Sequence, residues 1–273
     1  NNLHMKRNIL QFTILLLLAS FFSCSDKKDD PEKYRKGWIL VWEDNFTDSS
    51  DPSVWKKIPR GKHPMNKYMS ENSFLYIHQD GNLVLRGMQN LSESSAIPFL
   101  TGGITREGFK ENETGRIEIR ASINPASGAW TFIRLLPENR KENIAINIME
   151  QYNYDDFIYQ SVTTEYTTIK KMTDNPPSTM IVGVNPARYH IYGVEKYPDS
   201  LVFYVDGVRT RKYPRILTQI TGQFPFNDQD LNLHIGICIN KETDSDALPV
   251  DMFIDWVRYY KQIPPTEGVM NDQ

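Results

Sequence analysis

Residues 116–123 read RIEIRASI, with isoleucine at 117, 119 and 123 and charged or small residues between them. This period of two predicts an antiparallel β-strand with one buried face and one polar face. Similar short runs recur along the chain, separated by turn residues such as Asp80-Gly81 and Asp206-Gly207, which predict hairpins. No long helical pattern and no repeat interrupt them. We therefore predict an all-β fold, with a single β-sandwich domain of the jelly-roll type over residues 37–262.

The composition narrows the function classes. The chain has 273 residues, 24% of them charged, and a formal net charge of −3. A nucleic-acid-binding protein would show a strong basic excess or a basic stripe, so we expect no nucleic acid as partner. Aromatic residues make up 12% of the chain, which suits both strands and surfaces that stack on sugar rings.

The N-terminal segment has the features of a targeting sequence. Basic Lys6 and Arg7 precede an apolar run over residues 9–22, which is short for a membrane span but suits a secretory signal peptide. Cys24 directly after the run resembles the acylated cysteine of bacterial lipoproteins. We expect residues 1–24 to be leader and signal peptide, with lipidation at Cys24. The alternative is an ordinary signal peptide that is cut elsewhere.

The segments that flank the predicted domain look polar and irregular. Residues 25–36 are charged and contain a proline, which predicts a tether between lipid and domain, and residues 263–273 predict a flexible tail. We expect a lipid-anchored protein of the cell envelope, at the outer-membrane surface. The second cysteine, Cys238, lies in the apolar run LHIGICI and is predicted to be a buried free thiol.

Several segments together resemble one family in order and spacing. They are VWEDNFTD, DGNLVLRG, TGGITREGFKENETGRIEIRASI, GAWTFIRLLPE, YHIYGVEKYPDSLVFYVDG and LPVDMFIDWVRYYK. This ordered set is similar to glycoside hydrolase family 16 over nearly all of the predicted domain. The resemblance implies a concave β-jelly roll that acts on β-glucans or β-galactans with retention of configuration.

The catalytic strand of that family carries the pattern Glu-x-Asp-x-x-Glu. The first Glu is the nucleophile, the Asp assists it, and the last Glu is the general acid and base, brought to the same face by a bulge. On residues 143–152, NIAINIMEQY, the pattern places Ala145 at the nucleophile, Asn147 at the assisting position and Glu150 at the acid/base. A methyl group cannot form a glycosyl-enzyme intermediate. For Glu150, the alternative is a strand-end acid in a polar cleft.

Other positions of the family pattern also differ. The resemblance places Trp130 at the cleft wall, although core packing is the alternative, and puts Arg134 where a second Trp is common. Arg134 is expected to face the cleft, where it could bind a hydroxyl, a carboxylate or a sulfate. Thr163 stands at a frequent His position, and Lys196 stands at a usual Trp position. We expect substrate contacts from Trp130, Arg134, Tyr159 and Lys196.

The remaining polar signals are less specific. A basic segment holds six residues that either form a solvated loop or touch a glycan at the cleft edge: Lys56, Lys57, Arg60, Lys62, His63 and Lys67. His190 and His234 are expected to be hydrogen-bonded core histidines, because neither has a partner at metal-site spacing. The resemblance also raises a structural Ca²⁺ with Asp255 as ligand, supported by one matched side chain. No cofactor is expected to be required.

These observations favour a surface lipoprotein that binds a β-linked polysaccharide, with hydrolysis lost or much reduced. Its partners would be the glycan, the membrane through Cys24, and proteins of a glycan-uptake system. One alternative is an active endo-acting hydrolase that uses Glu150 as acid with a displaced base such as Glu142 or Glu165. Another is a non-catalytic assembly lipoprotein whose cleft binds a protein.

Overall fold

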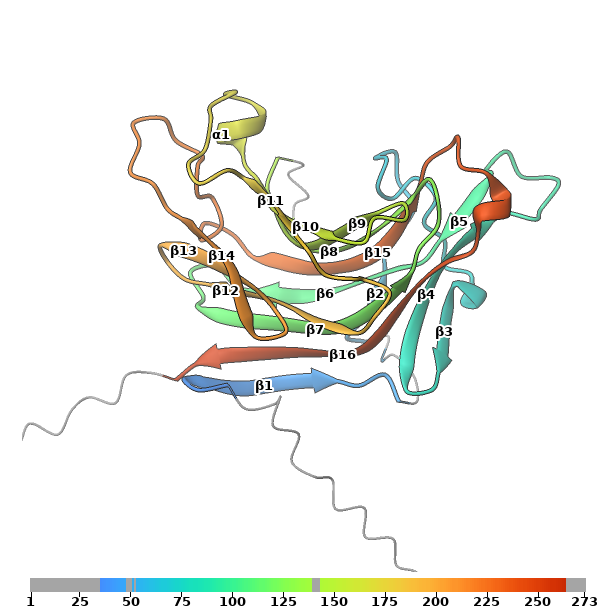
Figure 1. The fold of residues 1–273 in the computed structure, drawn as a ribbon, viewed down its shortest axis with the longest axis horizontal. Helices are drawn as coiled ribbons and strands as arrows, with labels where there is room; N and C mark the ends of the chain where they lie inside the picture. The colour runs from blue at the N-terminus through green and yellow to red at the C-terminus, as the bar shows by residue number, and fades with distance from the viewer. Residues whose placement is uncertain (1–34, 48–50, 52, 139–142, 264–273) are drawn as a thin grey trace, which may run out of the picture. The chain divides into compact units, whose positions relative to one another are not determined.

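The structure is a computed structural model that describes residues 35–47, 51, 53–138 and 143–263. The predicted signal peptide, Cys24, the tail from residue 264 and Glu142 lie outside the described residues, as does the predicted tether apart from Arg35 and Lys36. All strands belong to one compact unit and form two antiparallel sheets (Figure 1). The predicted all-β jelly roll is thereby confirmed. No helix within the described ranges is long and apolar enough to cross a membrane.

The larger sheet has nine strands. Two of them lie beside the main path, since β1 (Trp38–Asp44) pairs with β16 and β5 (Phe99–Thr101) pairs with β4. Along the main path the order is β14 (Val208–Pro214), β13 (Ser200–Val205), β12 (His190–Lys196), β7 (Gly115–Asn124), β16 (Val250–Gln262), β4 (Asn82–Gln89) and β3 (Tyr76–Gln79).

The second sheet has seven strands and carries the cleft described below. Its order is β11 (Thr179–Val182), β10 (Ile158–Thr163), β9 (Ala145–Tyr152), β8 (Ala129–Pro137), β15 (Leu231–Ile239), β6 (Gly103–Phe109) and β2 (Lys56–Lys57). Helical structure is limited to α1 (Glu165–Thr168) and two short 3-10 turns, Ser73–Leu75 and Ser245–Ala247, in the part of the chain that the structure describes.

Both predicted hairpins are confirmed. Asp80 and Gly81 join β3 to β4 with φ values of 52° and 74°, and Asp206 and Gly207 join β13 to β14 with φ values of 51° and 75°. Two consecutive residues with positive φ form a type I′ turn, whose twist matches that of the flanking strands. An Asp-Gly pair suits this turn because aspartate tolerates the left-handed region and glycine enters it without steric cost.

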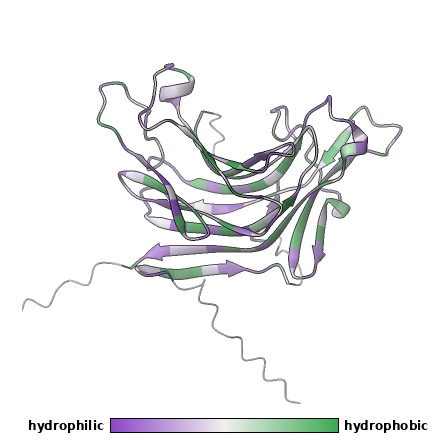
Figure 2. Ribbon diagram, in the orientation of Figure 1, coloured by the Kyte–Doolittle hydropathy of each residue, from purple (hydrophilic) through white to green (hydrophobic). Residues whose placement is uncertain are grey.

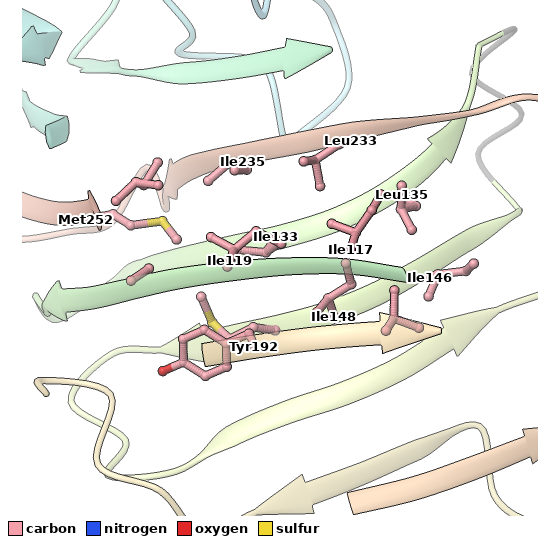
Figure 3. Close-up of a cluster of buried hydrophobic side chains, with 14 of the residues drawn as sticks. Ile117, Ile119, Ile133, Leu135, Ile146, Ile148, Tyr192, Leu233, Ile235 and Met252 are labelled. Carbon is pink, nitrogen blue, oxygen red and sulfur yellow. The ribbon is translucent and has the colours of Figure 1, made fainter. Parts of the chain in front are cut away.

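The core lies between the two sheets. The isoleucines of β7 meet apolar residues of β8, β9 and β15, all with little or no exposure (Figure 3). Hydrophobic and hydrophilic residues both occur along most strands (Figure 2). The apolar side chains of the two sheets pack against each other in the core. The labelled core residues are Ile117, Ile119, Ile133, Leu135, Ile146, Ile148, Tyr192, Leu233, Ile235 and Met252.

The polar face of β7 differs from the prediction in one respect. Arg116 and Glu118 are 5% and 0% exposed, so this face is also covered. Arg116 forms ion pairs with Glu118 and Glu195, and Arg35 reaches Glu118 at 2.9 Å. Buried charges are tolerated when they are paired, and each of these charged groups has an ion-pair partner, while Glu118 Oε2 has no hydrogen-bond partner among the described residues.

Candidate functional site: a cleft on the seven-stranded sheet

A cleft of about 620 Å³ lies on the face of the seven-stranded sheet that points away from the core. Strands β8, β9, β10 and β15 form its floor, and residues 61–66 form one wall. The lining residues are Ile58, Gly61, Lys62, His63, Pro64, Met65, Asn66, Trp130, Phe132, Arg134, Leu136, Ala145, Asn147, Glu150, Tyr152, Thr163 and His234.

Strand β9 brings Ala145, Asn147 and Glu150 together in this cleft. Alternation alone would place residues 145 and 147 on one face and residue 150 on the other. The pairing with β8 shifts at this point, because Ile133 faces Met149 whereas Arg134 faces Asn147. One extra residue in β9 therefore forms a bulge, which returns Glu150 to the face of Ala145 and Asn147.

Glu150 is held by two hydroxyl groups. Tyr152 Oη donates to Glu150 Oε1 at 3.2 Å, and Ser161 Oγ donates to Glu150 Oε2 at 3.2 Å. Burial raises the pKa of this carboxyl, while the two hydrogen bonds and the nearby charge of Arg134 oppose the rise. A carboxyl with a raised pKa and a fixed orientation can act as a proton donor at the wall of a cleft.

Asn147 and Ala145 form the floor beside Glu150. Asn147 Nδ2 donates to Ser161 Oγ at 2.8 Å, so one serine connects the amide to the acid. Asn147 Oδ1 is buried without a hydrogen-bond partner among the described residues. Ala145 presents only a methyl group and lies directly opposite Thr163 of β10. The floor therefore holds one acid, one amide and one methyl group.

Aromatic rings line the end of the cleft near Glu150. Trp130 lies opposite Tyr152 on the neighbouring strand, with ring centroids 5.7 Å apart. Trp130 Nε1 is buried and lacks a hydrogen-bond partner in the described part of the chain. Tyr159 packs edge-on against Tyr152 at 5.5 Å but does not line the cleft. Tyr152, and not the predicted Tyr159, is therefore the tyrosine that lines the cleft, and the ring of Tyr159 packs against it.

Arg134 faces the cleft from β8. Its guanidinium lies 4.8 Å from the ring centroid of Phe132, and its Nη1 contacts the sulfur of Met65. Within the described residues no carboxylate forms an ion pair with it, and its Nε is buried without a partner. Burial lowers the pKa of Arg134, although Glu150 nearby opposes this. A buried guanidinium without a bound anion is costly, so this group is suited to an anionic or hydroxyl-bearing ligand.

The basic segment divides between the cleft and the surface. Lys62 and His63 are exposed residues at the cleft wall. Lys57 Nζ donates to the carbonyl of Glu71 and Arg60 Nε donates to that of Met69. Lys67 lies over the ring of Tyr68 at 5.0 Å. Only part of this segment is therefore placed to touch a ligand.

Lys196 is a correction to the sequence-based expectation. Its side chain is 0% exposed on β12 of the nine-stranded sheet, and its Nζ donates to the carbonyl of Glu113 at 2.7 Å. It does not line the cleft. Burial lowers the pKa of Lys196 to about 8. Lys196 was suggested because it occupies a position that contacts substrate in the family pattern. Its strand, β12, belongs to the nine-stranded sheet, whereas the cleft lies on the seven-stranded sheet.

Asp255, suggested as a calcium ligand, is paired with an arginine in the structure. It accepts a hydrogen bond from Arg120 Nη1 and forms an ion pair with that guanidinium. No group of three or more acidic, histidine or cysteine side chains is placed to hold a metal in the described ranges. A hard cation such as Ca²⁺ needs six or more oxygen ligands. The Asp255 carboxylate is already paired with the Arg120 guanidinium, and this pairing competes with calcium binding.

The two histidines have different surroundings. His190 Nδ1 lies 2.7 Å from Asp206 Oδ2 and its Nε2 lies 3.0 Å from the carbonyl of Asn185, so it is hydrogen-bonded as expected. His234, expected in the core, lines the cleft instead, opposite Arg134 on the adjacent strand. Its Nε2 lies 3.4 Å from the hydroxyl of Thr105.

Three further residues were missed by the sequence reasoning. Tyr152 could have been found, since it lies two positions after Glu150 and shares its face by alternation. Ser161 reaches Glu150 only through the register of β9 with β10. Met65 belongs to the loop that covers Arg134, and no local pattern signals this contact.

Of the two acids suggested as a displaced base, only Glu165 lies in the described residues, and it is apart from the floor, whereas the thiol is buried beside the cleft wall. Glu165 begins α1 and does not line the cleft. Cys238 is a buried free thiol, as predicted, and its Sγ donates to the carbonyl of Met65 at 3.1 Å. Burial raises the pKa of this thiol, which argues against a role as a nucleophile.

A jelly roll with an acid, aromatic rings and basic groups in a cleft across one sheet defines a protein of the carbohydrate-active class. The family model for glycosyl hydrolases family 16 matches residues 100–258, which is more than half of the chain. The chain belongs to this family.

Known relatives agree with this assignment. The chain is 27% identical over 234 residues to a keratan-sulfate endo-1,4-β-galactosidase of Sphingobacterium multivorum. This match covers 81% of this chain and 55% of that protein. The chain therefore spans about half the length of this curated relative. A solved structure from work on endo-acting O-glycanases of the human gut microbiota matches with a TM-score of 0.69 and 22% identity, covering 82% of this chain and 100% of that one. The laminarinase of Rhodothermus marinus matches with a TM-score of 0.68 and 22% identity, covering 83% and 98%.

Proposed function

We propose that this protein binds a β-linked polysaccharide, a β-glucan or β-galactan, in its cleft and that its hydrolytic activity is lost or much reduced. The observation that carries the proposal is Ala145, which stands beside Asn147 and Glu150 on the bulged strand of a family 16 jelly roll. Retaining hydrolysis needs two carboxyl groups about 5–5.5 Å apart, one of them a nucleophile. The floor around Glu150 offers a methyl group and an amide at the other two positions.

Binding is supported by the groups that remain. Trp130 and Tyr152 present aromatic rings at one end of the cleft, and such rings stack on the apolar faces of sugars. Glu150, Arg134 and His234 supply hydrogen-bonding groups at the floor. Lys62 and His63 add basic groups at the wall, so an acidic glycan is a reasonable ligand. Keratan sulfate, named for the relative of Sphingobacterium multivorum, is therefore the first glycan to test.

A second candidate function is an active endo-acting hydrolase. It is favoured by one observation, the raised pKa of Glu150, because a buried acid held by two hydroxyls keeps the property needed to protonate a leaving group. It would need a second carboxylate in reach of the cleft, and Glu165 does not line the cleft.

The cellular setting extends the proposal. We infer lipidation at Cys24, a position at the outer-membrane surface and partner proteins of a glycan-uptake system. These inferences rest on the sequence of residues 5–24. Labelling with a palmitate analogue tests the first of them, with Cys24→Ser as the variant that should lose the label. Label retained by Cys24→Ser would contradict it.

Affinity electrophoresis across β-glucans and β-galactans tests binding. Wild-type protein should be retarded by at least one glycan, and Trp130→Ala should lower that affinity about tenfold or more, because a buried aromatic anchor carries much of a binding energy. Trp38→Ala is the matched control, since Trp38 lies on β1 of the other sheet. No retardation by any glycan would reject the proposal.

A further inference from the structure

We propose that two adjoining segments, residues 169–172 and 215–222, dock on a lipid surface that carries anionic headgroups. We call them the apolar tip. They follow α1 and β14, and both project from the end of the sandwich at which α1 lies (Figure 1). Lys170 Nζ donates to the carbonyl of Thr221 at 2.6 Å and to its hydroxyl at 2.8 Å, which holds the two segments together. The inference goes beyond glycan binding, because no residue of the apolar tip lines the cleft.

Four apolar side chains of the apolar tip face solvent. Ile169, Met172 and Ile220 are exposed, and Leu217 is 97% exposed, so it projects with almost no protein around it. Single exposed apolar residues are ordinary on a protein surface. Four of them on two adjoining segments form a patch, and such patches mark contact with a membrane or with another protein.

The charges of the apolar tip are all positive. Lys170, Lys171 and Arg215 are exposed, and the two segments contain no acidic residue. None of these three cations forms an ion pair with a described residue. The whole chain has a formal net charge of −3, so this concentration of cations is local. Basic side chains beside exposed apolar residues complement anionic headgroups, because each cation near such a surface adds to the attraction.

The border of the apolar tip carries charges of both signs. Glu165 lies beside Gly222, and the carbonyl of Asp199 accepts a hydrogen bond from the backbone N–H of Arg215 at 2.7 Å. Lys212 is exposed on β14. The apolar tip and its border therefore hold four cations against two acids, and the local charge stays positive.

The shape of the apolar tip favours a lipid surface over a protein partner. Its apolar side chains stand on two projecting segments, and the most exposed of them, Leu217, has almost no protein around it. A protein partner needs a matched and well-packed surface, whereas the acyl region of a bilayer accepts an apolar side chain of any shape. We therefore expect the apolar side chains to enter the lipid while the cations stay at the headgroups.

The test uses the chain from Ser25 onward, so that neither the apolar run of residues 9–22 nor a lipid on Cys24 contributes. All described strands belong to one compact unit, so this chain keeps the whole folded part. Its binding is measured by flotation with vesicles of equal parts phosphatidylglycerol and phosphatidylethanolamine, and with vesicles of phosphatidylcholine. We expect binding to the anionic vesicles to be at least about tenfold tighter, and to weaken as salt is added.

Two results of this comparison would overturn the inference. Equal binding to both kinds of vesicle would show that the cations do not contribute. Absence of binding to the anionic vesicles would show that the apolar tip does not enter lipid, and this is the result expected if its partner is a protein.

A leucine variant tests the apolar contact. Leu217→Asp should bind the anionic vesicles about tenfold more weakly or worse, because it removes a leucine from the lipid and adds a negative charge. Leu91→Asp is the matched control, since Leu91 is 74% exposed between β4 and β5, outside the apolar tip. It should stay within about twofold of wild type. Both exposed sites should leave the urea midpoint unchanged. Equal binding by the two variants would overturn the inference.

A lysine variant tests the charge independently. Lys170→Gln combined with Lys171→Gln should weaken binding to the anionic vesicles about tenfold and reduce its dependence on salt. Lys56→Gln combined with Lys241→Gln removes the same charge outside the apolar tip and should have a smaller effect. A loss of binding that is the same for both double variants would contradict the assigned surface.

Discussion

At the scale of single residues, Ala145 decides the chemistry we expect. A carboxylate at this position would attack the anomeric carbon, and a methyl group has no lone pair to offer. Asn147 cannot supply the negative charge that separates the pKa values of two neighbouring carboxyls. Glu150 alone keeps the character of a catalytic group, held by Tyr152 and Ser161. A lone acid can protonate a leaving oxygen, and we propose that the covalent step is lost.

Glu150 leads to a prediction about stability. Because burial raises its pKa above the ordinary value of 4.5, the folded protein keeps this proton over a pH range in which the unfolded chain has released it. Ionised Glu150 therefore lowers the free energy of unfolding at neutral pH, and this penalty disappears below about pH 4. We expect Glu150→Gln to unfold at a higher urea concentration than wild type at pH 7, with a difference that shrinks on acidification.

The control for this experiment is Glu93→Gln, because Glu93 is exposed. It should change the urea midpoint little at any pH. A Glu150→Gln protein that is less stable than wild type at pH 7, or equally shifted at pH 4 and pH 7, would contradict the assigned cause.

Lys196 gives a prediction of the same kind with the opposite sign. Its pKa is lowered to about 8 from 10.5, so between these values the unfolded chain binds more protons than the folded one. The contribution of Lys196 to the free energy of unfolding therefore rises with pH across this window. Measured at pH 8 and pH 10, the stability of wild type relative to Lys196→Met should increase. A difference that stays constant would show that Lys196 does not titrate in this range.

At the scale of elements, two bulges shape the cleft sheet. The bulge in β9 turns Glu150 toward Asn147, as described above. The second lies in β6, where Leu231 of β15 faces Phe109 and Asn232 faces Glu107, so Gly108 is the extra residue. A Cβ at Gly108 would lie 2.5 Å from the carbonyl oxygen of Leu231. Glycine at a bulge lets the neighbouring backbone approach this closely.

Gly108→Ala should therefore destabilise the protein. The added methyl group meets the backbone of Leu231, which cannot move aside as a side chain can, and also lies 2.8 Å from Leu135 Cδ2. We therefore expect a loss of about 1–3 kcal/mol in the free energy of unfolding. Gly183→Ala is the matched control, because a Cβ there meets nothing within 4 Å. It should change stability by no more than about 1 kcal/mol. Equal effects of the two substitutions in urea titrations would contradict this account.

The strands and hairpins could be predicted because their signals are local. Alternating isoleucines in β7 and the Asp-Gly turns act over a few residues, and both are found in the structure. The burial of Arg116 and Glu118 on the other face of β7 could not be predicted in this way. It depends on Glu195 and Arg35, which lie far away in sequence and approach only in the folded chain.

At the scale of the whole molecule, some residues of the cleft could be predicted from the sequence and others could not. Positions 145, 147 and 150 share one strand, so the family pattern and its bulge suffice to place them together. His234 and residues 61–66 come from separate segments and line the cleft through strand register and loop packing. Ser161 does not line the cleft but reaches Glu150 through the register of β10 with β9. Lys196 was misplaced for the same reason, since similarity along the chain does not say which sheet a strand enters.

The whole molecule is then a family 16 scaffold with a cleft of about 620 Å³, in which we propose that the catalytic set is incomplete. We expect binding to survive while turnover does not, because the aromatic and basic groups lie apart from position 145. The most direct test measures reducing ends released from keratan sulfate, laminarin and other β-glycans by wild type and by the double variant with Ala145→Glu and Asn147→Asp. Our account predicts no release above background by wild type on any glycan that it binds, and measurable release by the double variant. Robust turnover by the wild-type protein would contradict it.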